Sequence, residues 1–207
     1  MIPKQLFFIW IGNNKPSYVD FAINTFKEVN FDFDINFIHI KDIDKTNNDD
    51  VLYVLDKIKN DKDSLYYKIY NRPWAKYSYK NIIGKYSNIT DCLKFYYVNK
   101  YGGIYLDCDT FPVKPFDSDL LSNDYFYGTN QSNNNLIDYY FMGSQKGKLL
   151  NIYENPELRG KLFHINYPDT NSIHKNKQDF YNCSLKYSHN INNNYIIHFF
   201  DNTWKKK

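Results

Sequence analysis

One short stretch limits the fold of this chain more than any other, because a glycine pair in it starts an apolar strand that ends in two aspartates: Tyr101-Gly102-Gly103-Ile104-Tyr105-Leu106-Asp107-Cys108-Asp109-Thr110. Successive side chains of a strand point to opposite faces. Asp107 and Asp109 are therefore predicted to point the same way, with Ile104 and Leu106 filling the core. Both acids would meet at one site.

Paired carboxylates of this kind suit a hard divalent cation. Magnesium and manganese ions usually take one or two protein carboxylates and complete their shell with substrate phosphate and water. Asp107 and Asp109 thus predict a site that holds a cation against a diphosphate. The alternative is a pair of solvated acids at a strand end, since aspartate is common in turns.

The residues before this stretch have helical spacing. Over Thr90–Lys100 an apolar stripe is formed by Cys92, Phe95 and Tyr96. Asp91 and Lys94 lie one turn apart near the expected start of this helix, so together they could bind the hydroxyls of a ligand. The alternative is an ordinary surface ion pair.

Taken together, three separated blocks of the chain resemble glycosyltransferase family 32, the sugar-binding DXD group. The first is Ile2-Pro3-Lys4 with Leu6–Gly12, the second runs from Thr90-Asp91 and Lys94 through Tyr101–Asp109 to Pro112 and Lys114-Pro115, and the third is His198 with Asn202-Thr203-Trp204. The chain departs from the family pattern at Thr90, Lys94 and Phe7. Lysine keeps the charge of the usual arginine but loses its planar fork, which concerns sugar selection rather than fold.

The resemblance implies a single α/β domain of GT-A type, in which helices flank a Rossmann-like nucleotide-binding mixed sheet. It implies a metal-dependent, retaining transfer of a hexose from a nucleotide sugar, with UDP-sugars favoured, to a glycan or lipid-linked saccharide. Residues 1–115 would form the nucleotide-sugar and metal half, and residues 116–207 the acceptor side and a carboxyl-terminal lid.

The resemblance also implies roles for particular residues. Asp109 would bind Mn²⁺ or Mg²⁺ directly, and Asp107 would hold the ribose or a sugar hydroxyl and reach the ion through water. Asp91 and Lys94 would hold the donor sugar. Asp91, Asp107 and Asp109 are the expected catalytic residues.

Further residues are expected to complete the site from both ends of the chain. His198, Asn202 and Thr203 would approach the cation, delivered by the short apolar pair Ile196 and Ile197, and Trp204 would close over the diphosphate. The alternative for Trp204 is an anchor on the core. Trp10 and Gly103 are the remaining expected substrate contacts, Trp10 meeting the base or packing in the core.

The other segments predict a nucleotide-binding opening. Leu6–Ile11 reads as a strand, Pro16–Val29 as a helix and Phe37–Ile40 as a second strand, which together favour a Rossmann-like unit. Asp42–Asn71 is mostly helical in pattern. Arg72 is interpreted as a solvated arginine, with a phosphate contact as the alternative.

Composition narrows the class of protein. The 207 residues suit one domain, since domains typically hold about 100 to 200 residues. The net charge is +3 and no basic block exceeds Lys205–Lys207, which disfavours nucleic acid as a partner. Without a visible signal peptide, the chain is expected in the cytoplasm. The basic tail is a candidate contact to the inner membrane face, and the commoner interpretation of such a tail is a frayed, solvated end. Three cysteines suggest neither a disulfide framework nor a zinc site.

Two other functions fit parts of the pattern. A non-catalytic module that binds nucleotide sugar or glycan would keep the same pocket without turnover. Asp107-Cys108-Asp109-Thr110 also resembles the aspartyl-nucleophile phosphatases, although their motif normally ends the first strand of the domain.

Overall fold

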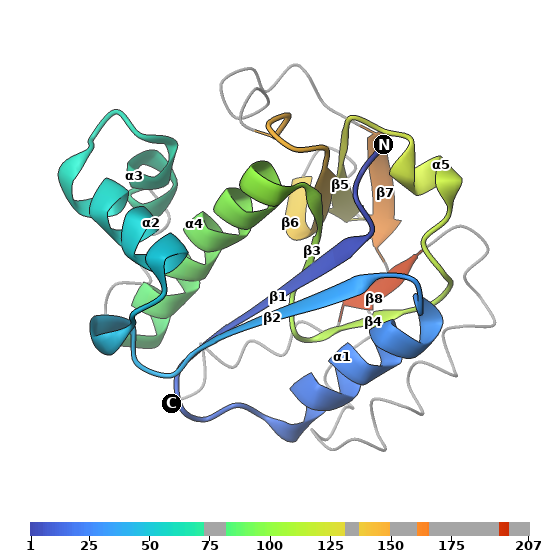
Figure 1. Ribbon diagram of the computed structural model, residues 1–207, viewed down its shortest axis with the longest axis horizontal. Coiled ribbons are helices and arrows are strands. Elements are labelled where there is room, and N and C mark those ends of the chain that lie inside the picture. Colours follow the sequence, from blue (N-terminus) through green and yellow to red (C-terminus); the bar gives the residue numbers. More distant parts are fainter. Residues whose placement is uncertain (73–81, 131–136, 150–160, 166–194, 199–207) are drawn as a thin grey trace.

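The structure is a computed structural model, and it describes residues 1–72, 82–130, 137–149, 161–165 and 195–198. Within these residues two sheets are formed, one of six strands and one of two. Helices pack on both faces of the larger sheet (Figure 1).

The chain opens with the predicted strand, helix and strand. These are β1 (Gln5–Ile11), α1 (Ser17–Val29) and β2 (Asp34–Ile40). The two strands pair in parallel along their whole length, from Gln5 opposite Asp34 to Ile11 opposite Ile40. β1 carries an unbroken apolar run because both of its faces are covered, as is typical of parallel strands.

Four helical segments follow β2. They are the short 3₁₀ helix η1 (Ile43–Lys45), α2 (Asp49–Asn60), α3 (Leu65–Tyr70) and α4 (Ile82–Tyr101). Side-chain oxygens cap three of them: Asp42 accepts from the Asp44 amide at 3.0 Å, and Asn48 and Ser64 accept from the Val51 and Tyr67 amides at 3.1 Å each.

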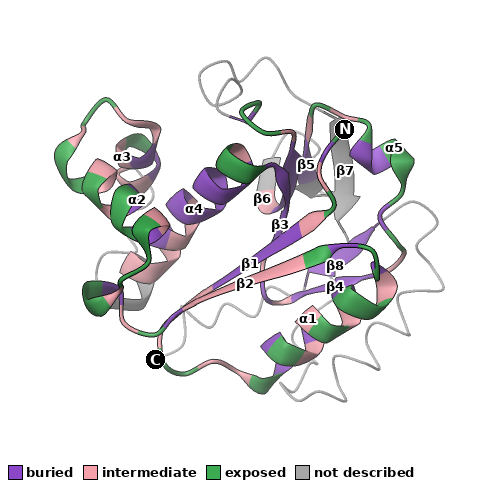
Figure 2. Ribbon diagram, in the orientation of Figure 1, coloured by how far each residue is buried: buried purple, intermediate pink, exposed green. Residues whose placement is uncertain are grey.

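Helix α4 is longer than the sequence predicted. It begins at Ile82, eight residues before Thr90, so Asp91 and Lys94 lie in its interior and not near its start. The middle of this helix is buried almost all round (Figure 2). The predicted apolar stripe, Cys92, Phe95 and Tyr96, lies wholly in this buried middle, so the sequence pattern marked only that part of the helix.

The larger sheet is mixed, with strand order β2-β1-β3-β6-β5-β7. Here β3 is Gly103–Leu106, β5 is Tyr125–Asn130, β6 is Ile137–Ser144 and β7 is Lys161–Ile165. β3 is parallel to β1, and β6 is antiparallel to both β3 and β5. The smaller sheet pairs β4 (Thr110–Pro112) with β8 (Ile196–His198), and α5 (Ser118–Leu121) follows β4. The predicted α/β class, with a Rossmann-like mixed sheet between helices, is confirmed.

Alternation along β3 divides the core between the two faces of the sheet. Ile104 and Leu106 join the cluster that includes Phe26 of α1, whereas Tyr105 joins the cluster that includes Leu93 of α4. Burial of each large apolar side chain contributes about 1.5–3 kcal/mol, so both helices are held firmly against the strand that leads to the acids.

The turn from α4 into β3 depends on glycine. Gly102 and Gly103 have φ angles of 72° and 109°, which residues with a side chain rarely adopt. A Cβ on Gly103 would lie 2.6 Å from Cγ and 2.7 Å from the carbonyl oxygen of Gln5 in β1. This close approach explains Gly103 by packing, and its expected contact with substrate stays a prediction.

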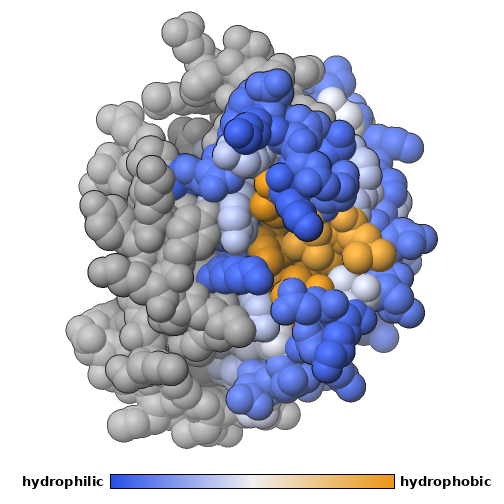
Figure 3. Space-filling view, turned by 90° about the vertical axis from the view of Figure 1, so that its left-hand side faces the viewer, coloured by the Kyte–Doolittle hydropathy of each residue, from blue (hydrophilic) through white to orange (hydrophobic). Residues whose placement is uncertain are grey.

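Figure 3 shows the face on the left of Figure 1, where α2 and α3 lie. In the right half of that view, apolar side chains gather between hydrophilic ones. On α2, Leu52 and Tyr53 are exposed. Among the described residues, no helix is both long and apolar enough to span a bilayer.

Candidate metal and donor site

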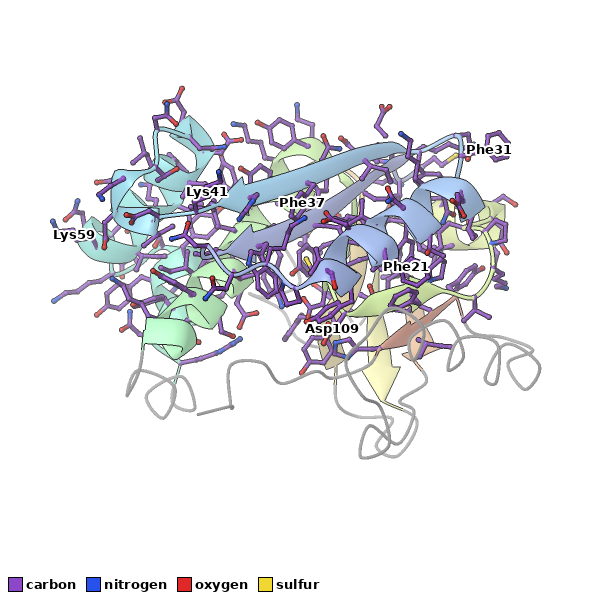
Figure 4. The ribbon with its side chains drawn as sticks, turned by 90° about the horizontal axis from the view of Figure 1, so that it is seen from below. Phe21, Phe31, Phe37, Lys41, Lys59 and Asp109 are labelled. Carbon is purple, nitrogen blue, oxygen red and sulfur yellow. The ribbon has the colours of Figure 1, made fainter. Side chains whose placement is uncertain are left out.

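The two aspartates do converge, although not by strand alternation as predicted. β3 ends at Leu106, and the chain turns at once: the amide and hydroxyl of Thr110 donate to the Asp107 carbonyl oxygen at 3.1 and 2.6 Å. The Asp107 amide is fixed by the carbonyl oxygen of Tyr140 in β6, at 3.0 Å. The turn, and not the pleat, brings Asp109 beside Asp107. In Figure 4 the labelled Asp109 lies below α1.

His198 reaches this turn from the far end of the chain. β8 pairs with β4 so that His198 lies opposite Thr110, and the side chain is buried. Its Nε2 is 3.0 Å from Oδ1 of Asp109 and 3.8 Å from Oδ2 of Asp107. One ligand atom from each of the three residues lies within 4.8 Å of the others. The predicted short strand that delivers His198 is present.

The electrostatics of this group favour a cation. Burial raises the pKa of Asp107 to about 6, and the neighbouring carboxylate of Asp109 adds to the rise, while Lys94, His198 and the Tyr105 hydroxyl oppose it. Two carboxylates held this close and away from water resist being charged together. Carboxylate oxygens and an imidazole nitrogen are ligands for Mn²⁺ or Mg²⁺, so the residues present fit the expected ion.

A second charged group lies on α4. Lys94 is buried, and its Nζ is 2.6 Å from Oδ1 of Asp91. The guanidinium of Arg72 donates to the other oxygen, Oδ2. Burial alone would raise the pKa of Asp91, but Lys94 and Arg72 hold it below its ordinary value. Arg72 was expected to be solvated, and that was wrong: it is mostly buried because it shares the charge of Asp91.

Two tyrosines connect these groups. The Tyr105 hydroxyl donates to Oδ1 of Asp107 at 2.7 Å, and the Tyr140 ring stacks on His198 at 4.4 Å between centroids. The Lys94 ammonium lies 5.4 Å from the Tyr105 ring and 5.7 Å from the Tyr140 ring. Sequence reasoning missed both tyrosines, because a tyrosine in a buried strand reads as core. Only the folded structure brings the Tyr105 hydroxyl to Asp107 and the Tyr140 ring to His198.

Trp10 lies near the end of β1, opposite His39 of β2. Its ring packs partly buried against the core on the α1 side, and the indole N–H is buried without a hydrogen-bond partner among the described residues. A buried donor without a partner is unusual, and it leaves a hydrogen bond for a ligand to make. The predicted contact with a base remains a prediction.

The remaining predicted residues lie outside the described part of the chain: Asn202, Thr203, Trp204 and the basic tail Lys205–Lys207. The phosphatase alternative expected its motif after a first strand. In the structure the motif follows β3, the third strand of the chain.

At the end of this α/β sheet's third strand, Asp107, Asp109 and His198 form a group of three side chains with the chemistry and spacing of metal ligands. The family described as glycosyltransferase sugar-binding region containing DXD motif matches residues 16–127, which is more than half of the chain. The matched region contains Asp91, Asp107 and Asp109. The chain belongs to this glycosyltransferase family.

Solved structures give more distant likenesses. The PaToxG glycosyltransferase is 19% identical, with a TM-score of 0.48, over 76% of this chain and 63% of its own. A glycosyltransferase involved in glycosylation of the major capsid of PBCV-1 is 10% identical, with a TM-score of 0.41, over 96% and 94%. The UDP-bound glycosyltransferase domain from the YGT toxin is 13% identical, with a TM-score of 0.34, over 95% and 55%. The match thus spans less than two thirds of the PaToxG and YGT chains. No curated protein sequence matches.

Proposed function

We propose that this protein is a metal-dependent, retaining glycosyltransferase. It moves a hexose from a nucleotide sugar, with UDP-sugars favoured, to a glycan or lipid-linked saccharide. The observation that carries the proposal is the convergence of Asp107, Asp109 and His198 at the DXD turn of a glycosyltransferase family.

The proposed metal site has two ligands in the described structure. Asp109 and His198 hold Mn²⁺ or Mg²⁺, and Asp107 holds the ribose or a sugar hydroxyl and reaches the ion through water. When bound, the ion neutralises charge that develops on the leaving diphosphate. Asn202 and Thr203 are proposed as further ligands, and Trp204 as a cover that excludes water.

The proposed sugar site lies on α4. Asp91 accepts hydrogen bonds from the hydroxyls of the donor sugar, and Lys94 donates to them. The contact of Arg72 with the second oxygen of Asp91 supports this role, because it fixes the direction of the remaining lone pairs. Trp10 meets the base, and Gly103 contributes backbone to the donor side.

The proposal extends to organisation and place. Residues 1–115 supply the nucleotide-sugar and metal half, and residues 116–207 the acceptor side and the lid. The enzyme works in the cytoplasm, with the Lys205–Lys207 tail touching anionic lipid at the inner membrane face, and nucleic acid is not its partner.

A turnover assay tests the proposal. Purified protein is incubated with α-linked UDP- and GDP-sugars and mixed saccharide acceptors, with Mn²⁺ or with EDTA, and the fresh product is read by proton NMR. An α-linked product that requires the metal is expected, since a retaining reaction keeps the anomeric configuration. A β-linked product, or transfer that is equal in EDTA, contradicts it. Donor binding without turnover would establish the binding module instead.

A further inference from the structure

Lys94 occupies an unusual place for an ammonium group. Its side chain is only 4% exposed, and the carboxylate paired with it belongs to Asp91. A buried cation is costly unless nearby negative charge compensates it. The negative groups around Lys94 therefore indicate which charges its ammonium compensates.

Asp91 alone does not neutralise this cation. The same carboxylate also pairs with Arg72, so one negative charge is shared between two positive ones. Taken by themselves, Arg72, Asp91 and Lys94 have a formal charge of +1. That excess charge is buried, where it is screened weakly.

The excess charge faces the candidate metal ligands through two aromatic rings. Tyr105, under the ammonium at 5.4 Å, donates its hydroxyl to Asp107. Tyr140, at 5.7 Å, stacks on His198. One tyrosine ring thus lies between Lys94 and Asp107, and another lies between Lys94 and His198.

The geometry points to Lys94 as an internal counter-ion of the aspartate pair, which opposes a divalent cation until an anionic diphosphate enters with it. This inference rests on the proposed function and adds a control to the same site: the cation binds weakly alone and tightly with the nucleotide. The physical reason is Coulombic, because a fixed positive charge near the site repels the ion, and the negative phosphates offset that repulsion.

The test is calorimetric titration of Mn²⁺, without nucleotide, into the full chain at pH 7.5. Lys94→Met removes the charge and keeps an unbranched side chain, and should tighten manganese binding about tenfold. Lys94→Arg keeps the charge and should bind as weakly as the wild type. Lys100→Met is the matched control, since Lys100 lies on the same helix, is 44% exposed and pairs with Asp50 instead.

The sign of the effect separates this role from a structural one. Loss of packing would weaken the metal site, whereas the inference predicts a gain in affinity from a substitution that also lowers sugar transfer. Asp91→Asn, which removes a negative charge and keeps the shape, should move affinity the opposite way. If Lys94→Met does not fold, Lys94→Gln, which removes the charge and keeps a polar end, decides the question, since it too should tighten manganese binding.

The outcomes are distinguishable from failure of the proposed function. Manganese affinity that is unchanged or weaker in Lys94→Met, or stronger in Asp91→Asn, overturns the counter-ion role. Wild-type protein that binds Mn²⁺ equally well with and without UDP also overturns it. If the wild type binds no Mn²⁺ even with UDP, the proposed function fails and this inference fails with it.

Discussion

The side chains of Asp50 and Asp107 are exposed to a similar small extent, 19% and 24%, yet their surroundings differ. The carboxylate of Asp50, at the start of α2, accepts from Lys100 at 2.6 Å, from the Tyr101 hydroxyl at 2.7 Å and from the Tyr96 hydroxyl at 2.8 Å. All three donors come from the last turns of α4. The interaction joins two helices and satisfies the charge.

The two carboxyl groups consequently titrate in opposite directions. Burial would raise the pKa of Asp50, but the hydrogen bonds from Lys100, Tyr101 and Tyr96 hold it below its ordinary value. Burial raises the pKa of Asp107 to about 6, and Asp109 adds to the rise. A satisfied acid stabilises the fold, whereas an acid held against another acid stores unfavourable energy that a bound cation can relieve.

The largest expected effect is the loss of metal-dependent donor binding in Asp109→Asn. Removing one charged ligand should weaken nucleotide-sugar binding in Mn²⁺ by about 100-fold or more, because few protein ligands hold such an ion. Calorimetry with UDP-sugars and Mn²⁺ measures it. Asp50→Asn is the control and should leave this affinity intact. Unchanged binding in Asp109→Asn would contradict the metal assignment.

The two acids should respond oppositely to neutralisation when no metal is present. Asp50→Asn should lower stability by about 1–3 kcal/mol at pH 7.5, since it breaks a charged hydrogen-bond network. Asp107→Asn should raise stability by about 1–3 kcal/mol, because it removes a charge that the fold penalises. Urea unfolding of both variants in EDTA provides the comparison. A loss of stability in Asp107→Asn would show that the acid is satisfied like Asp50.

The gain from Asp107→Asn should depend on pH. The folded-state pKa of about 6 lies above the ordinary value of 3.8. Protonated Asp107 therefore favours folding below that ordinary value, and this contribution is lost as the pH rises through 6. Thermal unfolding of variant and wild type should agree at pH 3.5 and separate between pH 4 and 6.5. A constant difference across that range would point to packing and not to charge.

The smallest expected effect comes from the two tyrosine hydroxyls. Tyr105→Phe removes the donor to Asp107, so the pKa of that acid should rise further and manganese affinity at pH 6 should fall about threefold. At pH 8, where the acid is ionised either way, the fall should be smaller. Tyr101→Phe removes the matching donor to Asp50 and should leave manganese affinity unchanged at both pH values. Equal effects of the two substitutions would contradict the proposed difference between the surroundings of Asp107 and those of Asp50.

Much of the fold could be predicted where a sequence pattern is produced by one kind of secondary structure only. The apolar run of β1, the periodicity of α1 and the glycine pair before β3 each correspond to an observed element. Helix α4 was predicted too short, because its apolar stripe was recognised only in the buried middle of the helix. The convergence of Asp107 with Asp109 was predicted correctly through the wrong geometry, since a turn replaces the strand.

The candidate site could be predicted only in part, for the same kind of reason. The predicted group of His198 with the two aspartates is assembled in the structure across 89 residues of sequence separation. Tyr105, Tyr140 and Arg72 were not predicted as site residues, because each acts through a partner that only strand pairing or helix packing brings close. Their residue types alone carry no signal of that partnership.

The most direct test of the account is the location of a manganese ion in crystals grown with Mn²⁺ and UDP. Anomalous diffraction at the manganese absorption edge identifies the ion independently of any assumption about its ligands. A single peak in contact with Asp109 and His198, beside Asp107, is the predicted result. An anomalous peak elsewhere, or UDP bound in this site with no manganese at the three residues, would contradict it.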